Sequence, residues 1–185
     1  MSLTILRRSF VAFALSFFVV AVLAFSQPLT PAQLAAIKAD IIANSDLNSQ
    51  PNTADGAFEI ARLYNLQASP AFTVWKTLVS ISDVGAAFNG TELGNLTTAN
   101  TGRLTAIAAF MGVGIRPYLA DQRQMFSDIF STGGVTSASL QVLWKRLATR
   151  IEKLFATGTG SNGAPATLVL EGQITYQEVQ QARNS

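Results

Sequence analysis

Arg146, Arg150 and Lys153 are the residues whose types and spacing could best support a function. Their separations of four and three residues would place all three side chains on one face of a helix. A basic face of this kind can bind an acidic partner surface or DNA in a channel, although many charged helix faces are simply solvated. We therefore name these three as candidate partner-binding residues, with solvation as the alternative.

A second candidate contact lies near the C-terminus, where the stretch Ala166–Leu170 predicts a β-strand. Leu168 and Leu170 would project to one side of this strand and Val169 to the other. A single strand in a helical chain lacks a partner ladder, so we expect it to pair with a strand from another subunit. Val179, in the predicted C-terminal helix, would pack against the same neighbour.

Most catalytic chemistry is excluded by composition, because the chain has neither cysteine nor histidine. Ser-His-Asp and Cys-His arrangements cannot be built, and a metal site would have to use carboxylates alone. The glycine-rich stretch Gly158–Gly163 lacks the Lys-Ser/Thr pair of a phosphate-binding loop and reads as a hinge. We expect no catalytic residues, no bound cofactor and no metal ligands.

Charged residues make up only 13% of the chain, against 49% hydrophobic residues. An average soluble domain has about 25% charged residues, so this composition suits a protein that buries surface against partners. The formal net charge is +2, and Arg7 and Arg8 account for the excess. The remaining sequence is neutral and gives no reason to propose bulk nucleic-acid binding.

Residues 1–26 are typical of a signal peptide or membrane anchor. A short basic start with Arg7 and Arg8 precedes an apolar run from Ser9 to Phe25 and a polar break. Three interpretations stay open: a cleaved signal, a retained anchor, or an upstream-extended start with no role in the mature fold.

The elements that must position the candidate residues are mainly helical, and their starts carry capping signals. Thr30 precedes Pro31 and Gln33 in a capping box, which sets the start of a helical domain over residues 29–156. Similar starts are predicted at Ser80, Thr136 and Thr175. Further helices are expected over residues 53–64, 70–78, 98–111 and 118–130, and a long amphipathic helix over 137–156.

The fold class predicted from these signals is mainly α: a small helical domain followed by an extended C-terminal arm, residues 157–185. The arm would hold the hinge, the short strand and a terminal helix. The expected core residues are Leu34, Ile37, Ile41, Phe58, Ile60, Trp75, Ile107, Phe126, Leu143 and Leu147.

From Leu29 onward the chain resembles a family of small structural proteins encoded in the head and tail morphogenesis region of tailed bacteriophages and prophages. The stretches that carry the resemblance are Leu29–Leu34, Asp55–Phe58, Val74–Thr77 and Lys145–Phe155. The resemblance implies a virion component at the head-to-tail interface, and residues 1–26 lie outside it.

We therefore expect a non-enzymatic virion structural protein of the neck, connector or tail-completion type, assembled as a ring. Its partners would be copies of itself and other virion proteins, with DNA in a channel as a further contact. The C-terminal arm would bind the neighbouring subunit. The alternative is an exported or membrane-anchored bacterial binding protein. In that case residues 1–26 would direct it to the periplasm or the inner membrane.

Overall fold

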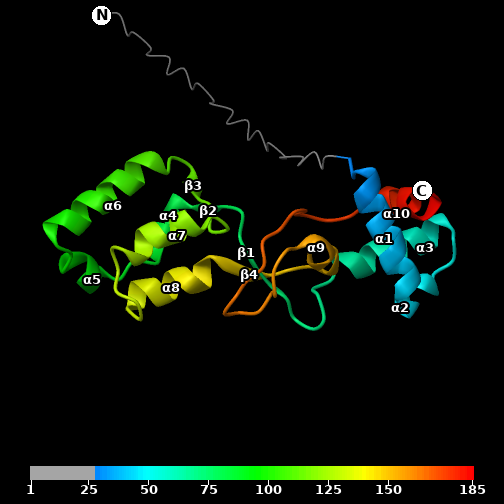
Figure 1. Cartoon of the computed structure of the whole chain (residues 1–185), viewed down its shortest axis with the longest axis horizontal. Coiled ribbons are helices and arrows are strands. Elements are labelled where there is room, and N and C mark those ends of the chain that lie inside the picture. The colour runs from blue at the N-terminus through cyan, green and yellow to red at the C-terminus, as the bar shows by residue number, and fades with distance from the viewer. Residues whose placement is uncertain (1–27) are drawn as a thin grey trace, which may run out of the picture.

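The computed structural model describes residues 28–185, and its elements form two helical lobes joined by short strands (Figure 1). We call the lobe that contains both ends of the described chain the terminal lobe, and the other the inserted lobe. The terminal lobe holds α1 (Pro31–Ala43), α2 (Ser45–Asn48), α3 (Ala54–Asn65), α9 (Arg150–Phe155) and α10 (Tyr176–Asn184). The inserted lobe holds α4 (Ile81–Ala86), α5 (Gly90–Gly94), α6 (Thr98–Phe110), α7 (Ala120–Ser127) and α8 (Val135–Leu143). The predicted mainly-α class is confirmed.

Two pairs of short antiparallel strands link these helices. At the junction of the lobes, β1 (Thr73–Trp75) pairs with β4 (Lys145–Leu147), with Val74 opposite Arg146. Within the inserted lobe, β2 (Val79–Ser80) pairs with β3 (Gly114–Ile115).

The first helix starts as its sequence predicts. The Thr30 hydroxyl accepts a hydrogen bond from the Gln33 backbone N–H at 3.3 Å, and the Gln33 side chain accepts one from the Thr30 backbone at 2.9 Å. Without these two bonds, neither backbone N–H group would have a hydrogen-bond acceptor within the helix. Pro31 occupies the first turn, where its missing N–H costs nothing.

The core of the terminal lobe joins both ends of the described chain. Ile37 of α1, Ile60 of α3 and Val179 of α10 are all fully buried in one cluster. Asn65 fixes the approach to α10, since its side-chain amide both donates to and accepts from the backbone of Ile174 at 2.9 Å.

The expected terminal helix is therefore confirmed, but the expectation that residues 157–185 form an arm free to clasp a neighbour is wrong. Val179 and Ala182 are buried against α1 and α3 of their own chain. The boundary at residue 157 does not separate two units, because an amphipathic helix buries its apolar stripe on the nearest apolar surface.

The inserted lobe has an aromatic core. The rings of Phe126 and Trp144 meet edge to face at 5.9 Å, and Phe88 stacks at a tilt on Phe130 at 5.3 Å. Such pairs add specific geometry to apolar burial. The described residues 28–185 thus contain two main cores, one in each lobe, with a small third cluster around Val74 at the junction.

The start of α8 differs from its prediction. Thr136 was expected as the N-cap, but α8 begins at Val135, and Thr136 is buried within the first turn. Glu92, more than forty residues earlier, accepts hydrogen bonds from the backbone N–H groups of Val135 and Thr136 at 2.7 and 2.8 Å. A carboxylate from α5 replaces the local cap and suits the positive end of the helix dipole.

Two predicted helices are wrong, because part of each segment forms a strand of the same antiparallel pair. Residues 70–78 form β1 and a loop, and the long helix over residues 137–156 is broken into α8, β4 and α9. The two segments pair with each other, so a long-range ladder satisfies the backbone groups that a helix would have satisfied locally. Thr149 then caps α9 through a complete capping box with Glu152.

The stretch 166–170, predicted as a strand, makes only isolated bridges, both to its own chain. Ala166 pairs with Val74 and Thr167 pairs with Thr157. The glycine-rich hinge is also held in place, because the Thr73 N–H donates to the Gly160 carbonyl at 2.7 Å. Gly160 has φ +66°, and a Cβ there would collide with the Phe72 ring.

Most of the predicted core is buried at least in part. Leu34, Ile37, Ile41, Ile60 and Phe126 are buried, and Trp75, Ile107 and Leu143 are half-buried. Phe58 is 63% exposed and Leu147 is 45% exposed, so these two predictions are wrong. Leu147 was placed in the core by helical spacing, which does not apply to its position in β4.

No helix within residues 28–185 has both the length and the apolar character needed to span a membrane. The predicted signal or anchor, residues 1–26, lies outside the described residues.

Candidate functional site

Arg146, the first candidate partner-binding residue, is engaged within its own chain. Its guanidinium donates to both carboxylate oxygens of Glu152 at 2.7 Å and to Glu171 at 3.0 Å. These hydrogen bonds raise the pKa of Arg146 further above its ordinary value, against the opposing effect of burial. Glu152 is 2% exposed and also accepts from the backbone N–H groups of Thr149 and Gly172.

Arg150 and Lys153 lie on α9, where they face the terminal lobe and the junction. Arg150 forms an ion pair with Asp46, whose hydrogen bond raises the pKa of the guanidinium. The Lys153 ammonium lies 5.7 Å from the centroid of the Phe72 ring. Because Arg146 is on a strand and the other two are on a separate helix, the continuous basic face predicted for these residues does not form.

The apolar candidates are spread over two environments. Leu168 and Leu170 are half-buried, and Val169 is 66% exposed, which matches the predicted alternation of sides. Val179 is fully buried in the terminal lobe. Partner binding by the exposed parts of this set stays a prediction, whereas Val179 has no surface to offer while α10 is docked.

Sequence reasoning missed an apolar surface feature that lies along α6. This helix of 13 residues contains no buried residue, although Leu104 and Ile107 pack partly against the inserted-lobe core. Phe110 at its end is 89% exposed, and Val113 in the following turn is 81% exposed. Large apolar side chains gathered at this exposure mark interaction surfaces more often than they mark solvated ones.

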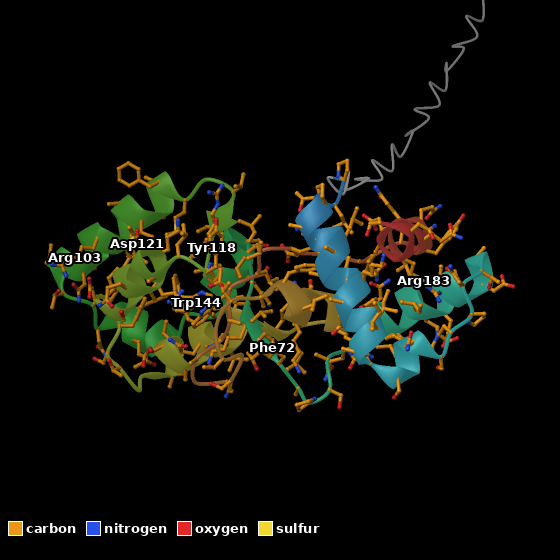
Figure 2. The ribbon with its side chains drawn as sticks, turned by 45° about the vertical axis from the view of Figure 1, so that its right-hand side comes forward. Phe72, Arg103, Tyr118, Asp121, Trp144 and Arg183 are labelled. Atoms are coloured by element: carbon orange, nitrogen blue, oxygen red, sulfur yellow. The ribbon has the colours of Figure 1, made fainter. Side chains whose placement is uncertain are left out.

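A groove of about 750 Å³ runs between α6, β3 and α7 beside these two residues. Its apolar walls come from Leu78, Ile107, Phe110, Met111, Val113 and Met125. Arg103, Arg116 and Asp128 also line it, and none of these three takes part in an ion pair within the part of the chain that the structure describes. We call this feature the α6 groove. Figure 2 shows Arg103 at the outer side of the inserted lobe, away from Trp144 in its core.

One signal in the sequence could have revealed this surface. Arg103 is the only charged residue of α6, whereas a helix with one solvated face normally carries several charges there. Leu104, Ile107 and Met111 are spaced to share one side of this helix, which is the side that packs partly or fully against the core. The uncharged opposite face, with Gly102 and Ala106, indicates a second contact.

A second, more polar hollow of about 660 Å³ lies in the terminal lobe between α1, α3 and α9. Three of its four charged side chains are hydrogen-bonded: Asp46 pairs with Arg150, and Asp40 accepts from the hydroxyl of Tyr64 at 2.9 Å. The fourth, Lys153, lies near the Phe72 ring. Burial and the nearby Asp40 raise the pKa of the Tyr64 phenol, which keeps it protonated. Nothing in this arrangement presents an activated base or nucleophile.

Among residues 28–185, no group of three or more carboxylates is placed to hold a metal ion. Comparisons of the chain with protein-family models, with curated proteins and with solved structures find no match.

Proposed function

We propose that the protein is a non-enzymatic structural component of a tailed-phage virion, at the head-to-tail interface, where it binds copies of itself and neighbouring virion proteins. The resemblance of residues 29–185 to head and tail morphogenesis proteins supports a location in the virion. The exposed apolar surface along α6 supports binding to other subunits.

The observation that carries the proposal is the outer face of α6. Phe110 and Val113 are almost fully exposed beside the α6 groove, and only Arg103 brings charge to the helix. Monomeric proteins seldom leave an apolar surface of this kind open to water, whereas subunits of assemblies cover it with a partner.

The composition agrees with this role. With 13% charged residues the chain has little of the charged surface that keeps a monomer apart from its neighbours. Ring-forming subunits bury a large share of their surface, so low charge is less costly for them.

The direct test is the protein content of purified particles. Virions of the phage or induced prophage that encodes the chain are purified by density gradient, and their peptides are quantified by mass spectrometry. We expect peptides from residues 28–185 at a fixed copy number relative to the portal protein. A phage-encoded replication protein serves as the negative control, and absence of the chain from infectious particles would overturn the proposal.

The alternative, an exported or membrane-anchored binding protein, is favoured by one observation, the apolar run that follows Arg7 and Arg8. Terminal sequencing of the protein made in its host separates the two proposals. A mature chain that begins near Gln27 and fractionates with the periplasm supports export. A chain found in particles supports the virion role.

A further inference from the structure

We propose that the α6 groove and Phe110 together form a self-complementary interface with a second copy of this chain, related by a two-fold axis. Phe110 of each copy enters the α6 groove of the other. This inference rests on the proposed function, because it names the partner that covers the exposed surface of the assembling subunit.

The first argument is that a knob and a hole lie on the same face. Phe110 is 89% exposed, and it forms one edge of a groove that Met111, Val113 and Met125 also line. In a two-fold contact the same patch serves both subunits, so the patch must hold both complementary parts. An exposed aromatic side chain beside an apolar hollow meets this requirement.

The second argument is the size of the neighbouring side chains on α6. Ala99, Gly102, Ala106 and Ala109 are exposed along the side of the helix next to Phe110. Side chains this small allow the backbone of a partner helix to approach closely. The α6 helix of a second copy carries the same small side chains, so the two helices can approach along this side without steric conflict.

The third argument is charge. Arg103, Arg116 and Asp128 line the groove, and none is in an ion pair within the described chain. A purely acidic partner would be repelled by Asp128. An uncharged ligand would form no ion pair with the guanidinium groups of Arg103 and Arg116. A second copy brings both signs, so the arginines of one rim can face the aspartate of the other.

This symmetry has a consequence for assembly. A two-fold contact is complete after two copies, because each surface is used up by its mate. A ring of more than two subunits then requires a second, different contact surface, and the α6 pair would be its repeating unit or would join two rings.

The test measures self-association of the full-length protein and of the protein that starts at Gln27, by analytical ultracentrifugation over a range of concentrations. We expect a reversible dimer in both. Phe110→Ser should weaken dimerisation by about 30-fold or more, the effect of losing a central aromatic anchor. Phe58→Ser removes an equally large and 63% exposed side chain from the other lobe, and it should leave the dimer unchanged.

Cross-linking gives a second measurement that does not depend on a loss of stability. Because the chain has no cysteine, Ala109→Cys introduces a unique thiol on the α6 face, and Gln181→Cys introduces one on α10. We expect disulfide-linked dimers to form about tenfold faster with the first variant than with the second, since the interface raises the effective thiol concentration.

Three results would overturn the inference. The first is a monomer at all concentrations. The second is a dimer that resists Phe110→Ser and cross-links no faster through Ala109→Cys. The third is dimerisation only after removal of residues 1–26, because the occupant of the groove would then be the chain's own N-terminal segment. Any of these results leaves the particle-content test of the proposed function unaffected.

Discussion

Arg146 and Glu152 form two parallel hydrogen bonds, each of 2.7 Å, between β4 and the first turn of α9. Glu152 is almost completely buried, and it also receives the backbone N–H of Gly172 from the C-terminal segment at 3.2 Å. The ion pair therefore ties three parts of the chain together at the junction of the two lobes. A side chain expected to face a partner is instead a central contact of the fold.

Replacing Arg146 with Ala should lower the free energy of unfolding by about 3 to 5 kcal/mol, because it leaves the buried Glu152 carboxylate without its counter-charge. Urea denaturation measures this difference. Arg62→Ala is the matched control, since it removes a solvent-exposed pair with Glu59 and should lower the free energy of unfolding far less than Arg146→Ala does. Equal losses in the two variants would contradict the structural role of Arg146.

The same ion pair predicts a pH dependence of stability. Burial raises the pKa of the Glu152 carboxyl, but hydrogen bonds from Arg146, Thr149 and Gly172 together hold it below the usual value of 4.5. Between the folded and unfolded pKa values the unfolded chain binds the additional proton. The stabilisation is thus fully present above the unfolded pKa and is lost as pH falls through the folded pKa.

We therefore expect the free energy of unfolding to decrease as pH is lowered below about 4.5, and to decrease less steeply in Glu152→Gln. Urea titrations of both proteins across this range provide the measurement. If the two proteins showed the same dependence on pH, the titration of Glu152 would not be coupled to folding.

Docking of α10 predicts different effects for two valines near the C-terminus. Val179→Ala should cost about 1.5 to 3 kcal/mol, since its side chain is fully buried against α1 and α3. Val169→Ala, at a position 66% exposed, should cost less than about 0.5 kcal/mol. A chain that ends at Ala156 should lose its cooperative thermal transition. A stable, folded product of that truncation would restore the interpretation of residues 157–185 as a free arm.

Two leucines test the break in the long predicted helix. Leu140 of α8 is 1% exposed, so Leu140→Ala should cost about 2 to 5 kcal/mol as a cavity in the inserted lobe. Leu147 of β4 is 45% exposed, so Leu147→Ala should cost less than about 1 kcal/mol. Thermal denaturation of the pair decides between one continuous helix, which would bury both leucines, and the helix–strand–helix arrangement.

The helix starts whose partners are close in sequence could be determined from the sequence alone. Thr30 with Gln33, and Thr175 with Glu178, form the capping boxes that their spacing predicts. The reason is that a capping box closes within one turn and needs no contact with the rest of the chain. The mainly-α class follows from the same local signals.

Only the tertiary structure decided the features that depend on distant partners. Residues 145–147 lie on a strand because residues 73–75 pair with them, and α8 is capped by Glu92 because the fold brings that carboxylate to its first turn. Helical periodicity in the sequence reveals neither interaction, since it relates only residues within a few turns of each other. For the same reason the sequence predicted a helix over residues 98–111 with Ile107 in the core, but not the α6 groove or the exposed Phe110. Those two features depend on which side of α6 the core of the inserted lobe leaves uncovered.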